Sequence, residues 1–173
     1  MTDGTSEQAE MDLFAQAIGE LVLWTSIIDG QLSTATALLF LKDDSFTAET
    51  LVGEIEFRRK AELLKTRAKL IAEADDWKEA ICRWVRSAEK VNSTRNTVAH
   101  QRPIHRSGGL RLQSHQLTRL LKDDGSQDPA DVAQVRAWIE AAKSCQAEGE
   151  IVIGNLQVFS LAWRQLRLDQ VQG

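Results

Sequence analysis

The chain has only two prolines, Pro103 and Pro129, so no proline interrupts the long stretch that precedes Pro103. Apolar residues in that stretch recur at intervals of three and four, which is the spacing of one face of an α-helix. An all-β domain of this size would need many more turn residues than ten glycines and two prolines supply. We therefore predict an all-α fold, a four-to-five-helix up-and-down bundle in a single domain over residues 1–173.

The apolar stripes place four helices along the chain. The first helix is predicted over about 6–41, weakened at Gly30, and the second over about Thr47–Ala72. The third starts at Asp76, where Asp76 and Glu79 have the spacing of a capping box, and continues toward Pro103. Residues 103–127 are predicted to form a long irregular excursion holding a short hairpin or a helical turn. The last helix is predicted to begin with Asp128 as its N-cap and to be interrupted near Gly149 or Gly154.

The composition excludes several other classes of protein. Two cysteines without a CxxC pair cannot form a disulfide framework, and they offer no zinc or redox motif. His100, His105 and His115 match no tight metal site, and we expect neither a metal nor a cofactor. No apolar run approaches the roughly 20 residues of a membrane span, and the acidic N-terminus does not resemble a signal peptide. We therefore expect a soluble cytoplasmic protein with no membrane partner.

Charge is distributed unevenly along the chain. The net charge is −4, yet residues 90–122 contain no Asp or Glu. Seven basic residues lie in this window: Lys90, Arg95, Arg102, Arg106, Arg111, Arg119 and Lys122. A local cluster of positive charge on an acidic chain can concentrate an anionic ligand at one place. The alternative is a solvated loop that is basic only for solubility.

The most informative motif lies at the predicted end of the third helix. Asn92, Asn96 and His100 are four residues apart and share one polar strip of the helix, with Arg95 beside it. We expect Asn96 to hydrogen-bond the imidazole of His100 and fix its orientation. Arginine matches phosphate oxygens, and histidine can accept a proton from a ribose 2′-OH or give one to a leaving 5′-oxygen. Alternatively, the two side chains only bond to carbonyls and favour the C-terminal helix dipole.

The run Arg95-Asn96-Thr-Val-Ala-His100 resembles the R-x4-6-H signature of the HEPN superfamily, in the "RN-x-x-AH" form of small bacterial HEPN-like proteins. The resemblance implies a helical bundle that forms a homodimer, with the two motifs meeting at a composite cleft. It also implies a metal-independent endoribonuclease of a toxin–antitoxin, abortive-infection or other antiviral defence system. Arg95 and His100 would be the catalytic pair, and Asn96 the polar residue that follows the arginine.

From the basic window we expect Lys90, Arg102, His105 and Arg106 to bind the substrate, for which single-stranded RNA is the best candidate. Some HEPN toxins carry a tyrosine two positions after the histidine, which a partner enzyme modifies. Here that position holds Arg102 and the chain has no tyrosine, so that mode of neutralisation by an antitoxin is absent. A second hypothesis remains open: a catalytically inactive HEPN-like dimer that binds a nucleotide or a partner protein.

Overall fold

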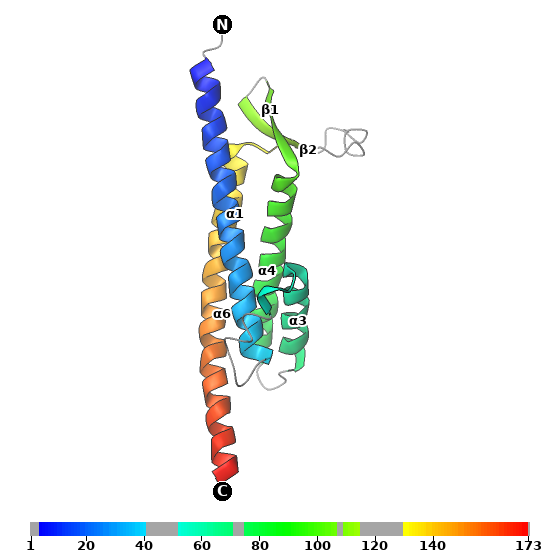
Figure 1. Ribbon diagram of the computed structural model, residues 1–173, viewed down its shortest axis with the longest axis vertical. Helices are drawn as coiled ribbons and strands as arrows, with labels where there is room; N and C mark the ends of the chain where they lie inside the picture. The colour runs from blue at the N-terminus through cyan, green and yellow to red at the C-terminus, as the bar shows by residue number, and fades with distance from the viewer. Residues whose placement is uncertain (1–3, 41–51, 71–74, 107–108, 115–129, 173) are drawn as a thin grey trace. The chain divides into compact units, whose positions relative to one another are not determined.

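The computed structural model describes residues 4–40, 52–70, 75–106, 109–114 and 130–172. It confirms the all-α helical bundle, with four long helices among the described residues (Figure 1). These are α1 (Gly4–Phe40), α3 (Phe57–Leu70), α4 (Asp75–Ala99) and α6 (Val132–Gln172). Strands β1 (Gln101–Arg106) and β2 (Gly109–Ser114) pair antiparallel as a hairpin between α4 and α6.

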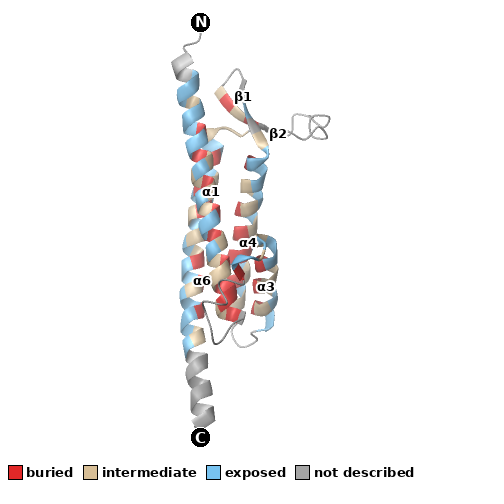
Figure 2. Ribbon diagram, in the orientation of Figure 1, coloured by how far each residue is buried: buried red, intermediate tan, exposed pale blue. Residues whose placement is uncertain are grey.

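The chain packs as two compact units that share three of the helices. One unit, here called the hairpin unit, combines residues 1–25 and 90–143; the other, the α3 unit, combines residues 26–89 and 144–173. Helices α1, α4 and α6 contribute a segment to each. Each unit has buried apolar side chains of its own, and the buried positions recur along every long helix (Figure 2).

Large apolar side chains on three helices and on β2 form the core of the hairpin unit. Its buried residues are Phe14, Ala17, Leu21, Val91, Val98, Leu110, Leu112, Val135, Ile139 and Ala142. In the α3 unit the largest fully buried side chains include Trp84, Lys60, Ile28, Leu32, Leu64 and Leu156. The helical spacing of the apolar residues therefore predicted the buried faces of α1, α4 and α6.

Several predicted boundaries differ from the structure. The second helix, predicted from Thr47, is interrupted before α3. A turn closed by the hydrogen bond from Ile55 N to Val52 O (3.0 Å) precedes α3, and the first backbone N–H groups of α3 to form hydrogen bonds donate them to Glu56 O. Helix α4 begins at Asp75, so Asp76 lies inside its first turn and is not the N-cap. Helix α4 ends at Ala99, and the chain is already extended when it reaches Pro103.

The last helix is capped by Asp131, not by Asp128. The Asp131 Oδ1 atom accepts a hydrogen bond of 2.8 Å from Gln134 N, which satisfies one of the free N–H groups of the first turn. Ala130 is still extended, because its carbonyl accepts a bond of 2.8 Å from Leu112 N. Asp128 and Pro129 lie outside the described residues. No interruption occurs at Gly149 or Gly154, nor at Gly30 of α1.

The predicted irregular excursion starts as ordered structure. Residues 101–106 and 109–114 form the hairpin, and Gly109 has a positive φ of 102°, a conformation that favours glycine. The hairpin was one of the two forms left open for this segment. The predicted remainder of the excursion, from 115 to 127, lies outside the described residues.

One helix meets two simple criteria for a membrane span. The Glu7–Leu39 portion of α1 is long enough, and an 18-residue window of it is apolar enough, with a mean hydropathy of 1.3. The expectation that no apolar run approaches a span is therefore too strong. The indication is weak all the same, because the core helix of a soluble protein meets both criteria, and α1 carries a row of buried core residues.

Candidate functional site

The Arg95–His100 motif occupies the C-terminal end of α4 in the hairpin unit. Arg95 and Asn96 lie in the last turns of the helix, and His100 is the first residue after it. The backbone N–H of His100 still bonds to Asn96 O and Thr97 O, both at 3.3 Å. On the other side of the helix Val91 and Val98 are buried, which fixes the rotation of α4 and leaves Asn96 and His100 exposed.

The guanidinium of Arg95 is partly buried and held by its neighbour. Its Nη1 donates a hydrogen bond of 2.9 Å to Asn96 Oδ1. Its Nε is buried and has no hydrogen-bond acceptor among the described residues. A buried nitrogen without an acceptor is unusual in a folded protein.

Asn96 orients Arg95 and not His100. No hydrogen bond within the described part of the chain joins Asn96 to the imidazole of His100, so this element of the prediction differs from the structure. The Asn96 carboxamide oxygen instead accepts from the adjacent arginine. His100 is exposed and its imidazole has no described partner.

The other predicted binding residues lie on both sides of the motif in the chain. Lys90 is exposed on α4. Arg102, His105 and Arg106 belong to β1, where they pair with Gln113, Leu110 and Gly109 of β2. Their backbones are described, whereas their side chains lie outside the described residues.

The surroundings of the motif are poor in negative charge. Among the described residues, no ion pair includes Lys90, Arg95 or His100. One carboxylate approaches the hairpin, since a Cβ on Gly109 would lie 3.5 Å from Glu10 Oε1 of α1. The positive charges of the motif are therefore left available for an anionic ligand.

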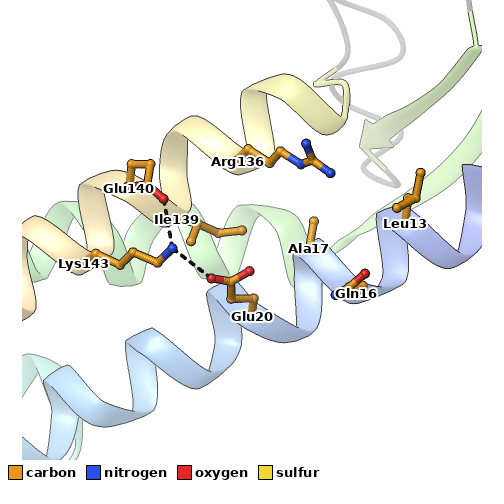
Figure 3. Close-up of a pocket in the computed structure, with 8 residues that line it drawn as sticks. All are labelled: Leu13, Gln16, Ala17, Glu20, Arg136, Ile139, Glu140 and Lys143. Atoms are coloured by element: carbon orange, nitrogen blue, oxygen red, sulfur yellow. Dashed lines mark hydrogen bonds and ion pairs between the residues drawn. The ribbon is translucent and has the colours of Figure 1, made fainter.

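A hollow of about 230 Å³ also lies between α1 and α6 in the same unit, and none of the motif residues lines it (Figure 3). Lys143 Nζ lies 2.9 Å from Glu140 Oε1 and 3.1 Å from Glu20 Oε1. The hydrogen bond from Lys143, with a smaller one from Trp24, lowers the pKa of Glu20. Hydrogen bonds to Glu140 and Glu20 raise the pKa of Lys143. Arg136 also lines the hollow, so its two carboxylates and two cations balance, and it offers no obvious reacting group.

Sequence analysis did not identify this hollow, because its two walls are more than a hundred residues apart in the chain. No group of three or more His, Cys, Asp or Glu side chains that could hold a metal ion occurs among the described residues. The two cysteines are free thiols, and burial raises the pKa of Cys145 to about 12.

No family model, curated protein or solved structure matches this chain. What the site can do therefore follows from the side chains that it contains.

Proposed function

We propose that this protein is a HEPN-like, metal-independent endoribonuclease that acts as a homodimer in the cytoplasm, in a toxin–antitoxin or antiviral defence setting. One observation carries the proposal: Arg95, which Asn96 holds and which forms no ion pair among the described residues, lies five residues before the exposed His100 at the end of one helix. An arginine without a counter-charge suits a phosphate, and an accessible imidazole suits proton transfer.

The reaction would proceed by attack of a ribose 2′-oxygen on the adjacent phosphorus. The bond from phosphorus to the 5′-oxygen breaks, which leaves a 2′,3′-cyclic phosphate on one fragment and a 5′-hydroxyl on the other. One imidazole accepts the 2′-OH proton, and a second group returns a proton to the leaving 5′-oxygen. In a homodimer the two copies of His100 would supply both groups. Arg95 would stabilise the negative charge that develops on the phosphate oxygens.

A second candidate, a non-enzymatic HEPN-like dimer that binds a nucleotide or a partner protein, is favoured by one observation. No described residue orients the His100 imidazole, whereas a general base is normally held in place by a partner. In this reading Arg95 binds an anionic group and no bond is broken.

The test is an RNA cleavage assay in excess EDTA, comparing the wild-type protein with His100→Ala. We expect His100→Ala to lower the cleavage rate by at least about 100-fold, which is the usual contribution of a general acid or base. The wild-type products should end in cyclic phosphate and 5′-hydroxyl groups. Arg86→Ala, at an exposed position earlier on α4, is the matched control, and it should retain cleavage.

Cleavage that survives His100→Ala would contradict the assignment of the site. If the folded wild-type protein cleaves no RNA, yet binds nucleotides in a manner that Arg95→Gln abolishes, the binding function is supported instead. Sedimentation of the same samples reports whether the protein is a dimer.

A further inference from the structure

The register of the hairpin gives it two chemically different faces. Leu110 and Leu112 are two residues apart on β2 and both are buried, so they mark the face that packs on the hairpin unit. Paired residues of antiparallel strands share a face. Their partners on β1, His105 and Pro103, share this face by register, although Pro103 is itself exposed.

The opposite face carries a row of arginines. Arg102 and Arg106 lie on it in β1, and Arg111 lies on it in β2, paired with Ile104 midway between them. Four residues along a strand span about 13 Å, with Arg111 near the middle. This span exceeds the distance between successive phosphates of an extended nucleic-acid strand, so Arg102 and Arg106 would contact phosphates that are not adjacent. Arg111 is partly buried and already has a partner within the protein, so Arg102 and Arg106 are the leading positions.

The arginine face has no acidic residue of its own and continues from the motif. Residues 101–114 contain no Asp or Glu. Arg102 is two residues from His100, because β1 begins directly after the turn that ends α4. Glu10 of α1 lies beside Gly109 at the turn of the hairpin, where the positive φ takes Gly109 out of the regular alternation of the strand.

Resting on the proposed function, we infer that the hairpin face opposite Leu110 and Leu112 holds single-stranded RNA by its phosphates, with Arg102 and Arg106 as the contacts. Arginine forks match phosphate oxygens, and a positively charged strip that follows the backbone is how single strands are held without sequence preference. The hairpin would thus bind the strand next to the residues that cleave it.

The test measures binding of a fluorescein-labelled oligouridylate by fluorescence anisotropy over a series of KCl concentrations. His100→Ala is used as the background, so that the RNA is not consumed. Arg102→Gln and Arg106→Gln should each weaken binding about fivefold, and together they should reduce the slope of log K against log salt by about 1.4. Arg102→Lys should retain most of the affinity, because it keeps the positive charge.

Two controls separate this surface from a general effect of charge. Lys69→Gln and Arg86→Gln each remove an exposed positive charge from the α3 unit. Both should bind as the background does. The inference is wrong if the double arginine variant, folded by circular dichroism, binds with an unchanged salt slope, or if Arg86→Gln weakens binding equally.

The outcome is independent of the test of catalysis. If cleavage depends on His100 but the substitutions of Arg102 and Arg106 leave RNA binding unchanged, only the inference about the arginine face is wrong. Binding that depends on both arginines, without any cleavage, would overturn the nuclease and leave the arginine face standing.

Discussion

The indole nitrogen of Trp84 donates a hydrogen bond of 3.1 Å to the carbonyl oxygen of Cys145, and so joins α4 to α6 inside the α3 unit. Gln31 of α1 makes the neighbouring contact, with its Nε2 2.9 Å from Gln146 O. Both donors reach carbonyls that lie within one turn of Gly149. A Cβ at Gly149 would lie 2.5 Å from Gln31 Oε1 and 2.8 Å from Trp84 Nε1. The two side chains can therefore approach α6 here because residue 149 has no side chain.

Gly149→Ala should therefore destabilise the protein by about 2 kcal/mol, because the extra carbon forces the packed helices apart or breaks these bonds. Gly154→Ala is the matched control on the same helix, where a Cβ meets nothing within 4 Å. It should stabilise the protein by up to about 1 kcal/mol, the usual difference between Ala and Gly in a helix. Urea denaturation of both variants measures the difference, and a stabilising Gly149→Ala would contradict this account.

The pairing of Lys60 with Asp29 predicts an asymmetry between two substitutions. Only 2% of the Lys60 side chain is exposed, although the neighbouring charged residues Glu54, Glu56, Arg58 and Arg59 are exposed. Its Nζ lies 2.9 and 3.0 Å from the two carboxylate oxygens of Asp29, whose side chain is 40% exposed.

Asp29→Asn should cost about 2–3 kcal/mol in the free energy of unfolding, because it leaves a buried ammonium without its counter-charge. Lys60→Met should cost much less, since it removes the buried charge and keeps the volume, while water can still reach Asp29. Chemical denaturation of the two variants compares these costs. Equal losses of stability in the two variants would show that the attraction within the ion pair determines the cost, and not the burial of a charge without its counter-charge.

The contact between Glu20 and Lys143 predicts a measurable change in titration. The Lys143 hydrogen bond is the main cause of the lowered pKa of Glu20, so Lys143→Met should raise that pKa toward its ordinary value. Trp24→Phe removes the weaker bond of 3.3 Å and should raise it less. Carboxyl ¹³C NMR of the two variants tests the order of the effects.

The same contact sets the direction of its effect on stability. The pKa of Glu20 is lowered on folding, so its contribution is present above the ordinary value of 4.5 and is lost as the pH falls through the lowered value. The pKa of Lys143 is raised, so its contribution is present below 10.5 and is lost as the pH rises through the raised value. If the contribution of this pair to the free energy of unfolding weakens between pH 4.5 and pH 10.5, that result is inconsistent with both pKa shifts.

The two thiols should differ in reactivity. Burial raises the pKa of Cys145 to about 12, with a smaller effect of the charge of Glu148, so almost no thiolate forms near neutral pH. Cys82 is partly exposed. A thiol reagent at mildly alkaline pH should therefore modify Cys82 first in the native protein and reach Cys145 only after unfolding. The Cys82→Ser variant checks the assignment. Mass spectrometry should find it unmodified in the native state and modified once in denaturant.

The sequence by itself determined the helical class, the buried faces of the long helices and the Arg95–His100 motif. These depend on interactions between residues three to five apart, which the periodicity of a helix fixes locally. Helix ends were less predictable: Asp131 and Asp128 have the same capping chemistry, and the bond between Leu112 and Ala130 keeps the chain extended until Asp131.

Only the tertiary structure decided the features that join residues far apart in the chain. Lys60 is buried because Asp29 of another helix supplies a counter-charge, and Gly149 is needed because Gln31 and Trp84 approach α6 at that point. The register of β1 and β2 likewise separates His105 from Arg102 and Arg106, which a list of basic residues cannot do. Such partners are set by packing between distant segments, whose energies are comparable to the local preferences and can override them.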